Sequence, residues 1–381
     1  MKTKVAIVSC KEYDRSLVLS SVEKCIELCG GMESIIKKGD DVLLKPNLLT
    51  AKPPEKAVTT HPEMLFALGS ILKRHTDKIR IGDSPAFGTC AHVIKKNGME
   101  KIVQELGLSI TEFQKSVSFK LPEGLFNLEL SKDCLEAPKL INMPKLKTHS
   151  QMLMTLAVKN LFGCIVGTRK ADWHFRSGVD YLSFARLLVE ICLALKPCFN
   201  LIDGITGMQG DGPNNGDPRE IGVIVGGENP FAVDFVVCKI VGIDPEELFT
   251  MQIARKMGIF GTREEEIEIL GETIENVQIK DFIRPKNHPL LFGPSFLQGF
   301  LRKTFTARPV IQPKTCQMCM ACKKICPAQA IQQEKDALKI SYQHCIRCYC
   351  CQEICPHKAI ETQQSLILRI MKRLVDETKV F

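Results

Sequence analysis

The chain has 381 residues, of which 45% are hydrophobic and 25% charged, and its formal net charge is +8. At about 150 residues per domain this length predicts two or three domains, and the composition is that of a globular chain, which excludes a fibre and argues against disorder. No stretch reaches the roughly 20 apolar residues of a membrane span, and the first residues lack the apolar region of a signal peptide, so we expect a cytoplasmic protein.

Hydrophobic runs alternate with amphipathic stretches through the first 285 residues. The predicted strands cover residues 4–9, 41–46, 78–83, 140–143, 199–203 and 221–226. The predicted helices cover residues 16–28, 62–75, 93–106, 152–162, 181–195 and 230–241. This alternation predicts an α/β domain with a mostly parallel sheet and helices on both faces.

Polar side chains follow several of the predicted strands. Lys45 lies at the end of the second strand, and Lys145, Lys147 and His149 follow the fourth. Ligands of such sheets bind in the crevice outside the carboxyl ends of the strands. These four residues are therefore the candidate catalytic residues, supplying charge and proton delivery to an anionic substrate. The alternative is that the lysines are solvated loop residues.

Two further segments have weaker signals. His174 shares a stretch of polar candidates with His149, Lys159 and Asn160. Residues 207–218 are rich in Gly, Asn and Pro, which predicts a long surface loop. A phosphate cradle is disfavoured there because the segment matches neither G-x-G-x-x-G nor the Walker A pattern.

Nine of the 18 cysteines crowd into residues 316–355, where two segments repeat at an offset of 29 residues. Each reads C-x2-C-x2-C-x3-C-P, the spacing of bacterial ferredoxins, in which the fourth cysteine ligates the other cluster. We therefore assign eight ligands to two [4Fe–4S] clusters. One cluster takes Cys316, Cys319, Cys322 and Cys355, and the second takes Cys345, Cys348, Cys351 and Cys326.

A zinc ribbon is the competing interpretation of the cysteines. It uses two C-x2-C pairs and would leave four of these eight cysteines unexplained. Cys350 fits neither motif, and we interpret it as a bystander thiol beside the ligands, where a redox role is the alternative.

The predicted domain organisation follows from these shifts in composition. The domains are residues 1–284, an α/β domain; 285–312, a linker or docking segment; 313–362, a small α+β two-cluster ferredoxin domain; and 363–381, an amphipathic helix. The linker has an apolar stripe that predicts a helix docked on the main domain, with peripheral membrane contact as the alternative.

Residues 285–381 hold 15 Lys and Arg against 6 Asp and Glu. Each ligated cluster contributes about −2, so much of this excess offsets cluster charge and the rest is available for an acidic partner.

The chain resembles the family called "domain of unknown function 362" over roughly residues 4–280. The resemblance rests on five segments: Lys45-Pro46-Asn47, Gly82-Asp83-Ser84-Pro85, the stretch from Asn142 to His149, Lys159-Asn160 and Asp203-Gly204. Members often carry a two-cluster ferredoxin module, which implies a redox-linked protein. The resemblance implies no substrate and no catalytic residue.

Three functional hypotheses follow. The first is an iron–sulfur electron-transfer protein whose α/β domain binds an anionic substrate or a redox partner, so that the protein acts as an oxidoreductase. The second is a non-enzymatic iron–sulfur scaffold or redox sensor. The third, a nucleic-acid binder, is disfavoured because the chain has one Trp and four Tyr and no basic–aromatic stacking surface.

Overall fold

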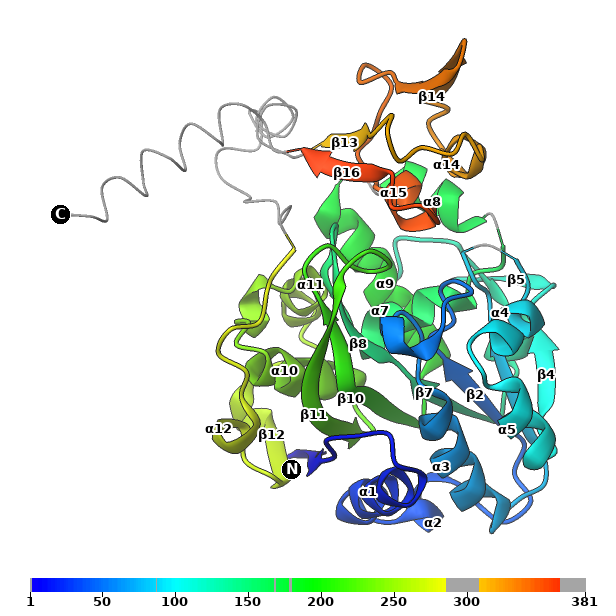
Figure 1. Cartoon of the computed structure of the whole chain (residues 1–381). Coiled ribbons are helices and arrows are strands. Elements are labelled where there is room, and N and C mark those ends of the chain that lie inside the picture. The colour runs from blue at the N-terminus through cyan, green and yellow to red at the C-terminus, as the bar shows by residue number, and fades with distance from the viewer. Residues whose placement is uncertain (1, 87, 168, 178–179, 286–307, 364–381) are drawn as a thin grey trace.

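The structure is a computed structural model that describes residues 2–86, 88–167, 169–177, 180–285 and 308–363. Figure 1 shows a larger part that ends near residue 285 and a smaller part, residues 308–363, on top of it. The apolar stripe of the predicted linker (Phe292, Phe296, Leu297, Phe300, Leu301 and Phe305) and nearly all of the predicted C-terminal helix lie outside the described residues.

A mixed, mostly parallel sheet forms the centre of the larger part. Its strands are β1 (Thr3–Ser9), β2 (Val42–Pro46), β3 (Ile79–Asp83), β4 (Ser109–Glu112), β7 (Lys139–Met143), β8 (Lys145–His149), β9 (Leu153–Thr155), β10 (Phe199–Gln209), β11 (Asp217–Gly227) and β12 (Ile267–Gly271). They lie in the order β12-β1-β11-β10-β7-β2-β3-β4. Off this path, β8 pairs with β10, and β9 pairs with β8. Strand β11 runs antiparallel to β1 and β10, and β9 to β8, while the other pairs are parallel. The predicted fold class is confirmed.

Helices cover both faces of this sheet (Figure 1). One face packs on α1 (Arg15–Leu28), α3 (Pro62–Lys73), α4 (Cys90–Lys96) and α5 (Glu100–Glu105). The other packs on α7 (Ala157–Asn160), α9 (Tyr181–Leu195), α10 (Pro230–Ile240) and α11 (Phe249–Lys256). Alternate residues of β1 divide between these faces, since Ala6 and Val8 join the first core whereas Val5 and Ile7 join the second. Burial on both faces explains why the strands read as continuous hydrophobic runs.

Two predicted helices differ from the structure. The segment 93–106 forms two helices, because Gly98 between them has a φ of 87°. The segment 152–162 begins with β9, where Thr155 pairs with Lys147 of β8, and becomes helical only at α7. Pairing with a neighbouring strand overrides the helical pattern of the sequence at this point.

Shorter elements complete the larger part. They are α2 (Met32–Ile35), η1 (Pro54–Lys56), β5 (Ser116–Phe119), β6 (Leu128–Ser131), α6 (Lys132–Leu135), η2 (Leu161–Cys164), α8 (Arg169–Ser177), η3 (Pro245–Glu247), η4 (Glu264–Glu266) and α12 (Ile274–Val277). Strands β5 and β6 form a separate antiparallel pair. Across the described parts of the chain, no helix has both the length and the apolar character that crossing a bilayer requires.

The smaller part consists of two strand pairs and two short helices. Its elements are β13 (Arg308–Ile311), α14 (Ala321–Ile325), β14 (Ile331–Glu334), β15 (Ala337–Ile340), α15 (Cys350–Ile354) and β16 (Ile360–Gln363). Strand β13 pairs antiparallel with β16, and β14 with β15. Residues 308–311, at the end of the predicted linker, are thus a strand of this part.

A short loop of the larger part holds the smaller part in place. It covers residues 210–216, between β10 and β11, and is shorter than the predicted loop. Asn214 and Asn215 donate to the carbonyl oxygens of Glu353 and Gln352 over 2.7 and 3.0 Å. Asn214 is 5% exposed, so this loop lies between the two parts and not on the open surface.

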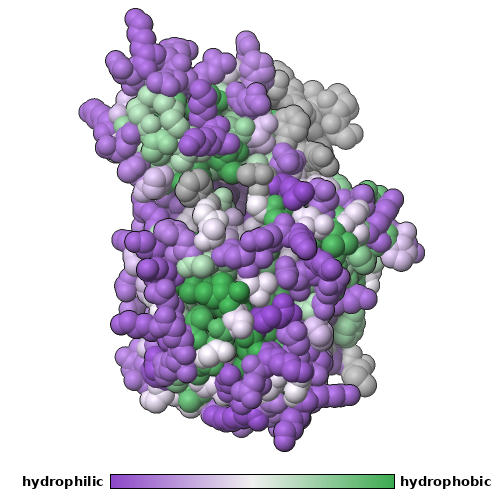
Figure 2. Space-filling view, turned by 90° about the vertical axis from the view of Figure 1, so that its right-hand side faces the viewer, coloured by the Kyte–Doolittle hydropathy of each residue, from purple (hydrophilic) through white to green (hydrophobic). Residues whose placement is uncertain are grey.

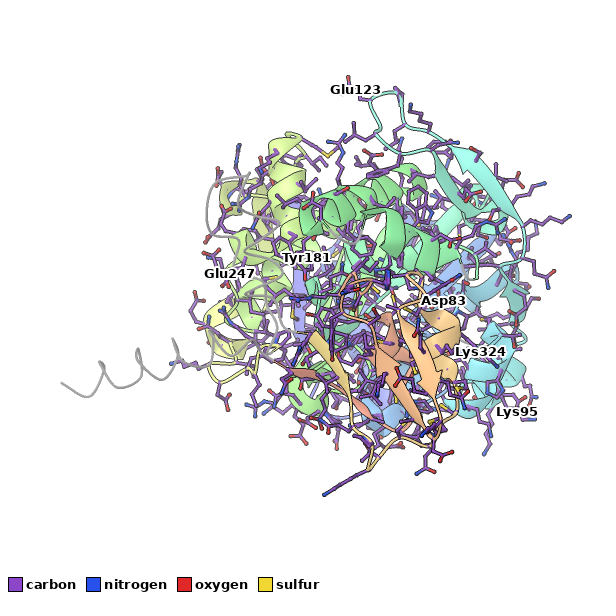
Figure 3. All side chains as sticks on the ribbon, turned by 90° about the horizontal axis from the view of Figure 1, so that it is seen from above. Asp83, Lys95, Glu123, Tyr181, Glu247 and Lys324 are labelled. Carbon is purple, nitrogen blue, oxygen red and sulfur yellow. The ribbon has the colours of Figure 1, made fainter. Side chains whose placement is uncertain are left out.

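Two further views place the parts relative to solvent. In Figure 2, hydrophilic side chains cover most of the face shown, and a hydrophobic area lies over the α/β part. Seen from above in Figure 3, Asp83 lies near the centre, beside the smaller part, whereas Lys95, Glu123 and Glu247 lie towards the margin. The carboxyl ends of the central strands therefore lie close to the smaller part.

Candidate functional site

Eight cysteines surround two small cavities in the smaller part of the protein. Cys316, Cys319, Cys322 and Cys355 line the first cavity, together with apolar side chains that include Ile311 and Leu338. The second cavity is lined by Cys326, Cys345, Cys348 and Cys351. The fourth cysteine of each motif thus lies at the cavity of the other motif, as the ferredoxin spacing predicts. The role of these cysteines as cluster ligands stays a prediction.

The backbone around the two cavities follows the same offset of 29 residues. Positive φ angles occur in pairs, at Met318 and Arg347 (51° and 56°) and at Met320 and Tyr349 (both 60°). Such left-handed residues let successive backbone N–H groups turn towards one centre, as in anion-binding nests. The N–H groups of Ala330 and Ala359 each donate to a cysteine sulfur at 3.3 Å. Both features suit negatively charged, thiolate-ligated groups.

The lining of both cavities is compatible with iron–sulfur clusters. Four cysteines and several apolar side chains surround each cavity. An apolar shell of this kind limits solvent access to a metal group and tunes its potential.

The two cysteine cavities differ in their exposure to solvent. Cys319 of the first is exposed. Cys348 and Cys351 of the second are 7% and 8% exposed. Lys323 and Lys324 are exposed on the chain beside the first cavity.

Lys45 and Asp83 form a buried ion pair at the ends of β2 and β3. The Lys45 Nζ lies 2.8 Å from Asp83 Oδ1. Asp83 also accepts hydrogen bonds from the N–H groups of Leu48 and Ser84. Gly163 passes over this pair, and a Cβ there would collide with Asp83 Oδ1 and lie 2.6 Å from Lys45 Nζ. A side chain at position 163 would therefore displace the Lys45–Asp83 ion pair, which explains the glycine at this position.

Lys145 belongs to a different cluster from the other predicted residues. Its Nζ lies 2.8 Å from Asp203 Oδ2 and donates to the Tyr13 hydroxyl over 2.8 Å. The Tyr13 hydroxyl in turn donates to Asp203 Oδ1 over 2.7 Å, and the Tyr13 ring stacks on His61. Burial lowers the pKa of Lys145, while Asp203 opposes this shift. The polar groups of Lys145, Asp203 and Tyr13 therefore pair with one another, and Lys145 does not line the cavity described below.

Lys147 is buried without a carboxylate in contact among the described residues. Its ammonium donates to Asn47 Oδ1 over 2.8 Å and to the Val58 carbonyl over 2.6 Å. Burial, reinforced by the charge of Lys159, lowers the pKa of Lys147 well below its usual range. Asn47 is held by Asn160, whose amide donates to Asn142 over 2.8 Å. With Lys45 and Lys145 also 1% exposed or less, the alternative of solvated loop lysines is wrong.

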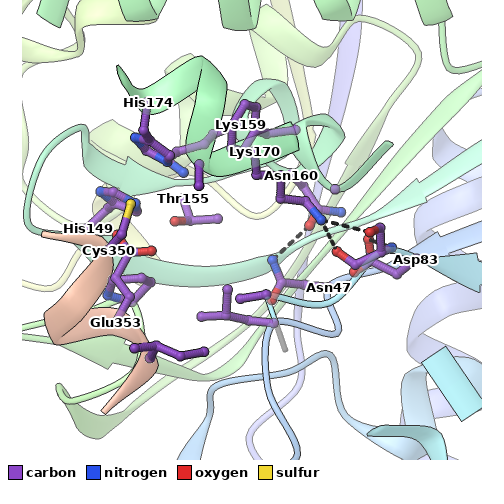
Figure 4. A pocket seen from close by; sticks show the side chains of 18 of the residues that line it. Asn47, Asp83, His149, Thr155, Lys159, Asn160, Lys170, His174, Cys350 and Glu353 are labelled. Carbon is purple, nitrogen blue, oxygen red and sulfur yellow. Dashed lines mark hydrogen bonds and ion pairs between the residues drawn. The ribbon is translucent and has the colours of Figure 1, made fainter. Parts of the chain in front are cut away.

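A cavity of about 90 Å³ lies where the larger and smaller parts meet (Figure 4). Its walls come from the ends of β2, β3, β8 and β9, from α7 and α8, and from α14 and α15 of the smaller part. Lys45, Lys147 and His149, three of the four predicted catalytic residues, line it. The smaller part contributes Ile325, Cys350, Glu353 and Ile354. Three of these, Ile325, Cys350 and Ile354, immediately precede predicted ligands of the clusters.

Four lysines line the cavity against two carboxylates, those of Asp83 and Glu353. Beyond Lys45 and Lys147, the lysines are Lys159 and Lys170. Burial lowers the pKa of Lys170 to about 8, although its Nζ donates to the Ser84 carbonyl and, over 2.9 Å, to Ser84 Oγ. Burial also lowers the pKa of Lys159. The excess of ammonium groups makes the cavity attractive to anions.

His149 connects the two parts across this cavity. Its Nδ1 accepts hydrogen bonds from the N–H groups of Gln151 and Met152, so the proton of the neutral ring is on Nε2. The Nε2 lies 3.2 Å from Glu353 Oε1. Burial lowers the pKa of His149 to about 4. Burial alone would raise the pKa of Glu353, but His149 and Lys159 lower it, so the carboxyl is ionised at neutral pH.

Sequence reasoning missed several residues of the cavity. Glu353 and Cys350 lie inside the second cysteine motif, whose spacing predicts only the ligands and a bystander role for Cys350. Thr155 lies in a segment whose pattern predicts a helix, and no sequence signal distinguishes Lys170 from other lysines. The available signal was that Glu353 and Cys350 differ from their counterparts in the first motif, Lys324 and Ala321.

Two family models match different parts of the chain, and one curated relative and one solved structure are similar to it. A family model described as a domain of unknown function, DUF362, matches residues 42–239, and a 4Fe-4S dicluster domain matches residues 308–356. The thylakoid-associated protein sll1697 of Synechocystis sp. (strain ATCC 27184 / PCC 6803 / Kazusa) is 38% identical over 309 residues, which cover 80% of this chain and 94% of that protein. The lactate racemase apoprotein from Thermoanaerobacterium thermosaccharolyticum aligns with a TM-score of 0.41 and 14% identity over 62% of this chain and 57% of its own.

Proposed function

The chain belongs to the DUF362 family and carries a 4Fe–4S ferredoxin-type domain, and we propose that it transfers electrons through two clusters to a small anionic acceptor. The observation that supports this function is the cavity that both parts line. Its cationic wall belongs to the α/β part, and its opposite wall consists of residues adjacent to predicted cluster ligands. A substrate in this cavity would therefore lie beside the clusters and out of bulk water.

When bound, each [4Fe–4S] cluster supplies a carrier that takes up and releases one electron. An acidic one-electron carrier protein is the proposed donor, which is oxidised by one electron per encounter. Two such encounters supply the two electrons that a two-electron acceptor takes up together with two protons. Each donor electron therefore ends on the acceptor, and the protons come from solvent through the ionisable side chains of the cavity.

The donor is expected at the exposed cysteine cavity. Residues 312–333 contain three lysines, Lys314, Lys323 and Lys324, and no Asp or Glu. All three are exposed on the chain that carries Cys319. Complementary charge raises association rates between redox partners and orients them, so an acidic donor protein would approach here.

The residues of the shared cavity have separate tasks in this proposal. Lys147 and Lys159 provide positive charge without a carboxylate in hydrogen-bond contact, and an anion would relieve the cost of burying Lys147. Ile325 and Ile354 restrict water on the cluster side. Lys170, with a pKa lowered to about 8, is suited to deliver a proton near neutral pH.

The test uses anaerobically purified, full-length protein whose clusters have been reconstituted. Iron and sulfide analysis and electron paramagnetic resonance of the reduced protein establish the clusters. Reduced protein is then mixed with anionic acceptors, and reoxidation is followed by the cluster absorption. Lys147→Met should keep both clusters and lose acceptor-dependent reoxidation, while Lys95→Met, which changes an exposed lysine of α4, should behave like wild type.

Two results would reject the proposal. Absence of cluster signals after reconstitution removes the electron-transfer function altogether. Equal reoxidation rates for wild type and Lys147→Met remove the cavity from it. If cluster loss changes partner binding while no acceptor is reduced, the protein is the non-enzymatic scaffold or sensor considered from the sequence.

The cellular location remains part of the proposal. The sequence favours the cytoplasm, whereas the Synechocystis relative is described as thylakoid-associated. Membrane fractionation of cells that express the chain at native level separates these two locations.

A further inference from the structure

Three polar groups on one side of the shared cavity have no hydrogen-bond partner among the described residues. They are the buried Thr155 Oγ1 and His174 Nδ1, and the ammonium of the half-buried Lys159, which lies 5.6 Å from the Phe162 ring and is attracted by the charge of Glu353. Thr155 and His174 are each only 4% exposed, so bulk water does not compensate them. Figure 4 shows these side chains from β9, α7 and α8 gathered at the cavity.

Buried polar groups are almost always hydrogen-bonded, so two buried unpaired groups beside an ammonium with no hydrogen-bond acceptor indicate a missing partner. Water can supply partners for the hydroxyl and the imidazole, but it cannot neutralise the ammonium. An oxyanion can satisfy all three, because it accepts several hydrogen bonds and carries the opposite charge. The cavity of about 90 Å³ is several times the space that one water molecule needs, so a ligand of several atoms fits.

The nearby groups favour an anion over a cation or a neutral ligand. His174 is neutral because burial between the rings of Phe162 and Phe184 lowers its pKa to about 3, so its Nδ1 can carry a proton to donate. Among the described residues that line the cavity, Glu353 is the carboxylate from the smaller part, and its Oε1 lies 3.2 Å from His149 Nε2. Asp83 is likewise occupied by Lys45 and by backbone N–H groups.

We infer that Lys159, Thr155 and His174 form a subsite for the carboxylate or phosphate group of the acceptor, which leaves the rest of that molecule facing Cys350 and the clusters. This inference rests on the proposed function for the identity of the ligand as an electron acceptor. Binding of the oxyanion itself requires neither reduction nor turnover. The subsite can therefore be tested separately.

The experiment is isothermal titration calorimetry of the cluster-loaded, oxidised full-length protein at constant ionic strength. Inorganic phosphate and succinate are the probes, and chloride is the control for general ionic effects. We expect saturable binding of at least one probe, and the tighter of the two identifies the group as phosphate or carboxylate. Lys159→Met and Thr155→Val should each weaken binding by about tenfold or more, because each removes a donor to a charged group.

Matched variants separate a binding role from a folding defect. Thr155→Ser retains the hydroxyl and should restore most of the affinity that Thr155→Val loses. Lys95→Met removes an exposed lysine far from the cavity and should bind like wild type. Circular dichroism and iron content should be the same for all variants that are compared.

Two outcomes overturn the inference: no saturable binding of either probe at millimolar concentrations, or equal binding by wild type and Lys159→Met. Either can occur while reduced protein still transfers electrons to another acceptor, so the proposed function would survive. Conversely, probe binding that Lys159→Met abolishes supports the subsite even if no acceptor is ever reduced.

Discussion

The ion pair between Lys45 and Asp83 allows a sharp test of how the ends of β2 and β3 are held at the cavity. Its Nζ–Oδ1 distance is 2.8 Å, and both side chains are almost fully buried. Asp83 keeps hydrogen bonds from the N–H groups of Leu48 and Ser84 if the lysine is removed. Lys45 keeps only the Pro46 carbonyl if the carboxylate is removed. Asp83 therefore keeps more hydrogen-bond partners after loss of Lys45 than Lys45 keeps after loss of the carboxylate.

We expect Asp83→Asn to lower the free energy of unfolding by about 3–5 kcal/mol, because it leaves Lys45 as an uncompensated buried charge. Lys45→Met should cost less, about 1–3 kcal/mol, because backbone donors still satisfy the carboxylate. The double variant should be more stable than Asp83→Asn alone, since replacing both members of a buried pair removes the unpaired charge.

Urea unfolding of the anaerobic, cluster-loaded protein, followed by far-UV circular dichroism, measures these differences. Two parts can unfold in separate steps, so the transition of the α/β part is the one to compare. Lys95→Met is the matched control, because it removes a lysine that is exposed on α4. The reasoning is refuted if Lys45→Met costs more than Asp83→Asn, or if the double variant loses the sum of both single effects.

Three further predictions address the clusters, the cavity and the donor surface. Cys326→Ser should abolish the same cluster as Cys345→Ser, and Cys355→Ser the same cluster as Cys316→Ser, with iron falling from about eight to about four atoms per chain each time. Electron paramagnetic resonance spectra that match Cys326→Ser with Cys316→Ser would contradict this assignment of ligands. Affinity for phosphate or succinate should fall as pH rises through about 8, where Lys170 loses its proton, and Lys170→Met should remove that step from the calorimetric pH profile. The double variant Lys323→Met/Lys324→Met should slow reduction by an acidic donor protein several-fold in stopped-flow measurements at low salt, and a rate difference that persists at high salt would argue against electrostatic docking.

The sequence predicted the parallel core well because its strands are buried on both faces. The hydrophobic runs of β1, β2 and β3 and the helix Tyr181–Leu195 could be read directly from composition and periodicity. The local sequence pattern predicted the wrong structure where contacts with distant parts of the chain determine the conformation. Residues 153–155 have a helical pattern but pair with β8, and the predicted surface loop after β10 is shortened and buried against the smaller part.

The candidate site was predictable only in part, for a physical reason. Strand ends converge in any parallel sheet, so Lys45, Lys147 and His149 could be expected near one another. Lys145 lies on the same strand, but Tyr13 and Asp203 hold it in a separate cluster. No pattern along the chain reveals that competition, because Asp203 comes from β10 and Tyr13 from the segment before α1.

The differences between the two cysteine motifs suggest a direction for electron transfer. At the positions between ligands, the first motif has small or basic residues and the second has residues buried against the α/β part. The aligned positions are Ala321, Lys323 and Lys324 in the first and Cys350, Gln352 and Glu353 in the second. Lys323 and Lys324 are exposed, whereas Gln352 is 4% exposed and Glu353 contacts His149. Of the described residues that line the cavity, Cys350, Glu353 and Ile354 come from the second motif and Ile325 from the first, so Lys323 and Lys324 stay accessible to the proposed donor. Exchanging Lys324 and Glu353 by Lys324→Glu/Glu353→Lys would place a cation against His149 and Lys159 and a carboxylate at the donor surface, so it should impair both docking of the smaller part and reduction by an acidic donor.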